Sequence, residues 1–182
     1  MTITTIKWTL AEYHQMIQAG ILAEKQVELI KGDIIQMAPE GEIHAYTSDE
    51  AGEYLVYLLG ERAKVRQGKP ISLPITDSEP QPDLAIVRRL GEQYRHHHPT
   101  PDDIFWVIEY SDSTFQKDRE IKNLIYAESG IPEYWIIHLK IPELIVLRDP
   151  MPTGYQSQTI FTTGTISPLA FPDLQVIIER LF

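Results

Sequence analysis

Residues 104–111, IFWVIEYS, decide the fold, because they place a carboxylate at the end of an otherwise apolar strand. The apolar run at 104–108 is typical of a buried strand, and a helix predicted over 115–129 follows it. Glu109 comes directly after the run, where an unpaired charge is costly unless it has a partner, a metal or a proton. This order of strand, acid and helix predicts a functional position at Glu109.

A second acid stands in a similar setting, because Asp83 opens the apolar run 84–87, LAIV. On the predicted helix, Asp118, Lys122 and Tyr126 recur at intervals of four and therefore share one face. Helical side chains lean toward the N-terminus of their helix, so we expect the Lys122 ammonium to reach back toward the preceding strand. Two acids on core strands and a lysine on the adjoining helix are the minimal set for metal-dependent phosphodiester cleavage.

Each of these residues also has a structural interpretation. Asp118 and Lys122 could form a surface salt bridge worth about 0.3–0.5 kcal/mol. Asp83 could start a strand from a turn, and Glu109 could accept backbone hydrogen bonds. Each residue alone favours the structural interpretation, whereas all of them together, in this order, favour a functional site.

Composition predicts a globular protein of one domain spanning 1–182. The chain has 182 residues, 43% of them hydrophobic, which is enough for a substantial core. It has no cysteine, so it offers neither a disulfide framework nor a thiolate zinc site. We see no secretory signal, and the longest apolar runs, of about five residues, are far shorter than the roughly 20 of a membrane span. These features predict a soluble, cytoplasmic protein.

The net charge of −10 argues against nucleic acid as a partner, because most nucleic-acid binders carry a basic surface. Acids gathered at a metal site are offset once cations bind, however, and net charge hides the distribution of charge. One stretch is basic, with Arg62, Lys64, Arg66 and Lys69 against Glu61 alone. Ordinary solvated surface charge explains this stretch at least as well as a binding site.

The remaining patterns predict the α/β class, with an α+β mixed sheet flanked by helices. Helices are expected over 10–19 and 43–62, and residues 27–37 predict a hairpin that turns at Lys31-Gly32. Residues 89–102 predict a loop. Strands are expected near 63–67, 71–75, 83–88, 103–110, 133–139, 143–147 and 155–163.

Several motifs together resemble a large bacterial family of putative restriction endonucleases, formerly a domain of unknown function, in the PD-(D/E)XK nuclease superfamily. The resemblance covers nearly the whole chain and implies a restriction-endonuclease-like core, with a central mixed β-sheet flanked by helices. The motifs are Pro82-Asp83, 107–111 (VIEYS), 118–122 (DREIK) with Tyr126, 130–135 (GIPEYW), the hairpin 27–33 (VELIKGD) and the helix start His44-Ala45.

The resemblance also implies roles for single residues. Asp83 and Glu109 are expected to bind Mg²⁺ or Mn²⁺, hard ions that prefer oxygen ligands. Lys122 is expected to orient the attacking water or hold the scissile phosphate. The superfamily usually places this lysine two residues after the second acid, where this chain has Ser111, so Lys122 corresponds to a lysine that has moved to the helix. By the same resemblance, Glu28 supports the metal.

Three further positions are weaker candidates. The resemblance implies that Asp118 orients Lys122. His44 and Tyr126 are expected to support the site or to have structural roles, with the two interpretations evenly balanced. The three histidines at 96–98 are expected on an exposed loop, because consecutive side chains rarely converge on one metal ion.

The sequence thus predicts a Mg²⁺-dependent endonuclease that hydrolyses DNA phosphodiester bonds. Because one site cuts one strand, a symmetric homodimer is expected, with the C-terminal strands as its contact. A non-catalytic dimeric interaction module that keeps the nuclease fold is the main alternative, favoured by the net charge of −10. A metal-dependent hydrolase of another substrate is a third. The sequence decides neither the target sequence nor DNA against RNA.

Overall fold

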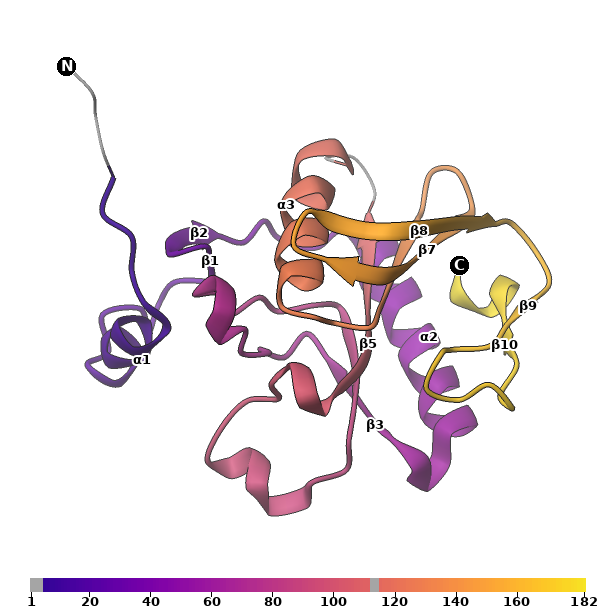
Figure 1. Cartoon of the computed structure of the whole chain (residues 1–182), viewed down its shortest axis with the longest axis horizontal. Helices are drawn as coiled ribbons and strands as arrows, with labels where there is room; N and C mark the ends of the chain where they lie inside the picture. The colour runs from indigo at the N-terminus through magenta and orange to yellow at the C-terminus, as the bar shows by residue number, and fades with distance from the viewer. Residues whose placement is uncertain (1–4, 112–114) are drawn as a thin grey trace.

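Six strands form a mixed sheet at the centre of the molecule (Figure 1). The computed structural model describes residues 5–111 and 115–182, and the side chains of all of these except 115–119. Neighbouring strands run antiparallel, except that β5 and β6 are parallel. In their order across the sheet, the strands are β3 (Lys64–Gln67), β4 (Leu84–Val87), β5 (Ile104–Ser111), β6 (Glu133–His138), β7 (Glu143–Met151) and β8 (Gly154–Phe161).

The sheet has a hydrophobic core on each face, because successive residues of a strand point to opposite sides. Helix α2 (Glu42–Leu59) covers one core, in which its Leu55 joins Trp106 and Ile108 of β5. Helix α3 (Phe115–Glu128) covers the other, and its Tyr126 packs there. A strand buried on both faces is apolar without alternation, which accounts for the continuous apolar runs of β4 and β5.

Helix α3 also connects the two parallel strands, since such a pair needs a crossover. It begins at Phe115, close after β5, and the chain enters β6 at Glu133. The helix packs against the sheet beside β7 and β8, and from there its Lys122 and Tyr126 side chains reach Glu109 near the end of β5. This arrangement positions the candidate site.

Smaller elements lie outside the six-stranded sheet. Helix α1 (Leu10–Gln18) begins with a capping box between Thr9 and Glu12. Strands β1 (Val27–Ile30) and β2 (Asp33–Gln36) pair through a turn in which Lys31 and Gly32 both have positive φ, of 47° and 75°, as in a type I′ hairpin. The remaining elements are β9 (Thr165–Ile166), β10 (Val176–Ile177) and 3₁₀ turns at Gly60–Arg62, Pro74–Thr76, Gly91–Arg95, Pro101–Asp103 and Ile178–Leu181.

The structure confirms the predicted fold class and corrects two predicted elements. The strand expected near 71–75 is wrong: Pro74–Thr76 forms a 3₁₀ turn, closed by backbone hydrogen bonds between Leu73 and Ser78. Proline at the start of the turn has no N–H to donate to a sheet. The helix expected over 43–62 ends at Leu59, and Gly60 takes a positive φ of 51°. Within the described residues, no helix is both long and apolar enough to cross a membrane.

Candidate functional site

Strand pairing brings Asp83 and Glu109 together at the end of β5. Leu84 of β4 pairs with Ile108 of β5 in antiparallel register, so the same register places Asp83 opposite Glu109. The backbone N–H of Tyr110 donates a hydrogen bond to Oδ2 of Asp83, with the heavy atoms 2.6 Å apart. Asp83, just before β4, and Glu109 of β5 therefore stand at the same end of the sheet.

Helix α3 supplies the partners of Glu109. Lys122 Nζ lies 2.8 Å from Oε1 of Glu109, and the Tyr126 hydroxyl donates to the same oxygen at 2.6 Å. Lys122 and Tyr126 are one helical turn apart and share the face that looks onto β5. The site is largely closed to solvent, because the Glu109 side chain is 11% exposed and that of Lys122 19%.

The electrostatics of this group follow from burial and close charges. Burial, together with the nearby charge of Asp83, raises the pKa of Glu109 to about 7, although its contacts with Lys122 and Tyr126 act to lower it. Burial acts to lower the pKa of Lys122, but the carboxylates of Glu109, Glu28 and Asp83 outweigh it and raise that pKa above its usual range. The ammonium therefore keeps its proton at neutral pH.

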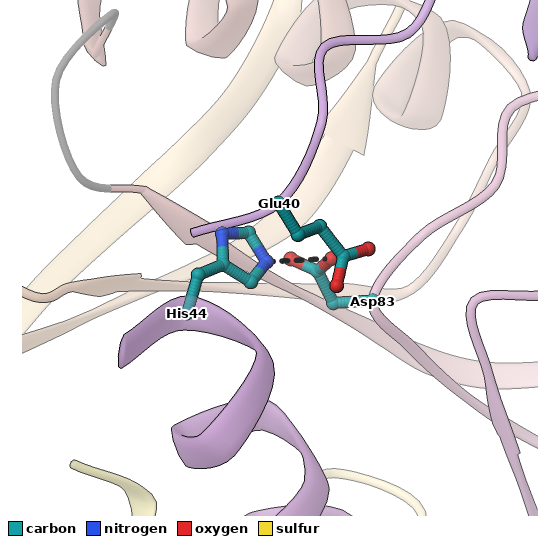
Figure 2. Close-up of side chains that lie close together, drawn as sticks. All are labelled: Glu40, His44 and Asp83. Carbon is teal, nitrogen blue, oxygen red and sulfur yellow. Dashed lines mark hydrogen bonds and ion pairs between the residues drawn. The ribbon is translucent and has the colours of Figure 1, made fainter. Parts of the chain in front are cut away.

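Asp83 has a second set of neighbours at the start of α2 (Figure 2). His44 Nε2, in the first turn of that helix, lies 3.0 Å from Oδ1 of Asp83. This hydrogen bond raises the pKa of His44, against the lowering effect of burial. Glu40, just before the helix, completes a group whose ligand atoms all lie within 4.8 Å of one another. Asp83 thus lies between a histidine on one side and Glu109 on the other.

Glu28 approaches from the N-terminal hairpin. Its Oε2 accepts a hydrogen bond from the backbone N–H of Gln81, at 3.3 Å. Its charge contributes to the raised pKa of both Lys122 and Tyr126, so it faces the α3 side of the same group. The side chain of Asp118 lies outside the described residues, and its expected contact with Lys122 stays a prediction.

The donor set suits a hard divalent cation. Among the described residues, both hydrogen bonds to Glu109 end on Oε1, which leaves Oε2 for a ligand role. Mg²⁺ and Mn²⁺ prefer carboxylate oxygens, which Asp83, Glu109 and Glu40 offer here. A cation between Asp83 and Glu109 would also relieve the repulsion that helps to raise the pKa of Glu109. The residues present therefore fit such an ion.

Sequence reasoning missed Glu40 in this group. The available signal was its spacing of four from His44, across the start of a predicted helix. In the loop at 96–98, His96 and His97 are exposed as expected, but His98 is half-buried. Its Nε2 lies 3.9 Å from the buried carboxylate of Glu79.

Comparisons with known proteins place the chain in a family. No curated protein matches its sequence. A crystal structure of a putative nuclease belonging to DUF820 from Anabaena variabilis ATCC 29413 is similar in fold, with a TM-score of 0.73 and 18% identity over 96% of this chain and 97% of that one. Residues 10–179, nearly the whole chain, match the family Uma2, described as "Putative restriction endonuclease". The chain therefore belongs to the Uma2 family of putative restriction endonucleases.

Proposed function

We propose that this protein is a metal-dependent nuclease of the PD-(D/E)XK type that hydrolyses DNA phosphodiester bonds, with Asp83, Glu109 and Lys122 as its catalytic residues. Family membership and the nuclease-like fold support nuclease activity in general. The finer proposal depends on one observation. One carboxylate just before β4, another on β5 and an ammonium on the following helix meet at the end of β5.

In this proposal Asp83 and Glu109 hold Mg²⁺ or Mn²⁺, and Glu28 and Glu40 add negative charge around the ion. When bound, the metal activates a water molecule and stabilises charge on the phosphate. The protein prepares the ligands in advance. The Tyr110 N–H and His44 fix the two oxygens of Asp83, and Tyr126 fixes Oε1 of Glu109.

Lys122 acts as a cation and hydrogen-bond donor in this proposal, because its raised pKa keeps it protonated at neutral pH. A protonated amine can hold a phosphate oxygen or orient a water molecule, but it cannot accept a proton from that water. Ser111 is uncharged, although it stands at the position where the superfamily usually has its lysine. The helix therefore supplies the ammonium that the strand lacks.

A non-catalytic interaction module with the nuclease fold is the second candidate function, and the net charge of −10 favours it. We further propose a homodimer in the cytoplasm. Two copies would place one site on each strand of a duplex, and exposed Ile160 and Met151 on the hairpin of β7 and β8 offer apolar contact area. The lack of cysteine suits a reducing compartment.

A cleavage assay tests the proposal. Wild-type protein is incubated with single- and double-stranded DNA and with RNA, in Mg²⁺ or in Mn²⁺, beside Lys122→Ala, Lys122→Arg and the control Lys25→Ala. We expect Lys122→Ala to lower the rate by about 10²–10³-fold, the loss typical of removing one group that stabilises the transition state. Lys122→Arg should also lose most of the cleavage rate, because the planar guanidinium of arginine does not replace the compact ammonium charge of lysine.

Lys25 is an exposed lysine between α1 and β1 and has no part in the proposed site, so its replacement should leave the rate unchanged. Undiminished cleavage by Lys122→Ala would end the catalytic role of Lys122. If the wild-type protein cleaves none of these substrates with either metal, the interaction module is favoured.

A further inference from the structure

A groove of about 880 Å³ lies between the C-terminal half of α2 and strand β3. Strand β3 is at the end of the six-stranded sheet, so only one of its edges is paired, with β4. Helix α2 packs beside it (Figure 1). The lining of this β3 groove includes Tyr57, Lys64, Arg66, Gln67 and Lys69.

The β3 groove gathers positive charge on a chain whose net charge is −10. Lys64, Arg66 and Lys69 line it against one carboxylate, that of Glu53. Across residues 5–111 and 120–182, none of these three cations forms an ion pair. Arg62, from the same basic stretch, is by contrast paired with an aspartate. The charge of the groove is therefore available to a ligand.

Arg66 has hydrogen-bond donors to spare. Its Nε is buried and has no hydrogen-bond partner among the described residues. One terminal nitrogen makes a long bond, of 3.4 Å, to the carbonyl oxygen of Pro70, and the guanidinium lies 5.6 Å from the centre of the Tyr94 ring. The guanidinium thus keeps its full positive charge beside the groove without an ion pair among the described residues.

The groove ends beside the candidate site. Gln67, its last strand residue, pairs with Leu84, and the N–H of Gly68 donates to the carbonyl oxygen of Asp83 at 2.9 Å. From Lys64 to Gln67 the strand extends about 10 Å, a length over which one strand of a duplex carries about three phosphates. Tyr57 is 86% exposed on the opposite wall. Its ring is available to stack on a base.

We propose that the β3 groove binds the sugar–phosphate backbone of one nucleic-acid strand and leads that strand to Asp83. This inference rests on the proposed nuclease function. Lysines on an edge strand also keep sheets from joining, which would explain Lys64 without any ligand. That alternative explains neither Lys69, which follows the strand, nor Tyr57, which belongs to α2. The same like charges disfavour a second copy of β3 as the occupant.

Binding and cleavage are measured separately to test this. Fluorescence anisotropy follows labelled single- and double-stranded DNA of 20 nucleotides in EDTA, where no metal-dependent cleavage takes place. The variants are Lys64→Gln, Lys69→Gln and Tyr57→Ala, and the matched control is Lys25→Gln, which removes the same charge from an exposed position. Each lysine variant should lower the slope of log affinity against log salt by about 1. Tyr57→Ala should weaken single-strand binding at least about fivefold.

The outcomes separate this inference from the proposed function. If the groove variants show the same affinities and salt slopes as Lys25→Gln, the proposed binding role of the β3 groove is wrong, even if the wild-type protein cleaves DNA. If binding depends on the groove residues but the wild-type protein cleaves nothing, the binding role of the β3 groove is supported and the proposed nuclease activity is rejected. Failure of wild type to bind any nucleic acid would overturn the groove as well. A change in oligomeric mass with Lys64→Gln, seen by sedimentation, would assign the groove to a second copy instead.

Discussion

Glu109 is the residue at which metal binding and protein stability can be told apart. Glu109→Gln keeps the shape of the side chain but removes its charge, so we expect Mn²⁺ to bind more weakly. The loss should exceed the roughly 10–100-fold typical of residues that only support metal ligands. Isothermal titration calorimetry gives the affinity, and circular dichroism reports whether the variant is folded. Unchanged affinity would remove Glu109 from the ligands, whereas an unfolded variant would assign it a structural role.

The same residue should make stability depend on pH. Burial raises the pKa of Glu109 from its ordinary value to about 7 in the folded protein. A carboxyl whose pKa is higher in the folded than in the unfolded protein holds its proton more tightly in the folded state. The resulting stabilisation is complete below the unfolded-state pKa of about 4.3 and is lost as pH rises through the folded-state pKa. We therefore expect the free energy of unfolding in EDTA to fall between pH 5 and pH 8 more steeply for wild type than for Glu109→Gln. Parallel urea-denaturation curves across this range would contradict the expectation.

At the scale of residues, the sequence predicted the contacts that depend on local geometry. Glu109 and Lys122 are joined by one strand–helix connection, so their encounter requires only that α3 pack back against the sheet. The approach of Glu40 and His44 to Asp83 depends instead on where α2 docks on the sheet. No local pattern contains that information, because it is fixed by packing between segments about 40 residues apart along the chain.

At the scale of elements, a buried carboxylate joins β6, β7 and the C-terminal segment. Glu133 is fully buried, and its Oε1 accepts hydrogen bonds from Arg148 at 2.7 and 2.9 Å and from the Trp135 ring at 2.8 Å. Its Oε2 accepts from the backbone N–H of Leu169 at 2.8 Å. These donors belong to β6, β7 and the segment after β9, so the carboxylate of Glu133 ties the three together.

Removing the arginine should therefore be costly. We expect Arg148→Met to lower the free energy of unfolding by about 3–5 kcal/mol, because it leaves a buried charge without its cation. The control is the double variant Glu133→Gln with Arg148→Met, which removes both charges and should recover most of the loss. Urea denaturation measures both. A double variant as unstable as Arg148→Met would show that packing of the arginine, and not its charge, matters.

Elements were predicted well where the apolar run is unbroken and poorly where proline interrupts it. The unbroken apolar runs in β4 and β5 are short and rich in β-branched or aromatic residues, which favours buried strands. The run at 71–75 is also buried in part, but it contains Ser72, and Pro74 interrupts it where the chain turns back. Short apolar runs beside proline are ambiguous because burial alone does not require a strand.

At the scale of the whole molecule, the proposed homodimer predicts a mass of twice 20.9 kDa. Light scattering at tens of micromolar should give this mass for wild type. Ile160 is 52% exposed on β8, so Ile160→Lys should yield monomers by placing a charge in the contact. Ile17→Lys, at an isoleucine 48% exposed on α1, is the matched control and should stay dimeric. A monomeric wild type would refute the stable dimer without touching the catalytic proposal.

The position of Lys122 on a crossover helix affects how the molecule would lose activity on heating. An amine on β5 would belong to a strand that pairs with β4 on one side and β6 on the other. Lys122 depends instead on the packing of α3 against the sheet through side chains such as Ile125 and Tyr126. A helix held this way can open as a local unit while the central strands stay protected from hydrogen exchange. Inactivation should therefore precede melting, and an inactivated sample should regain full activity on cooling, since its sheet has never come apart.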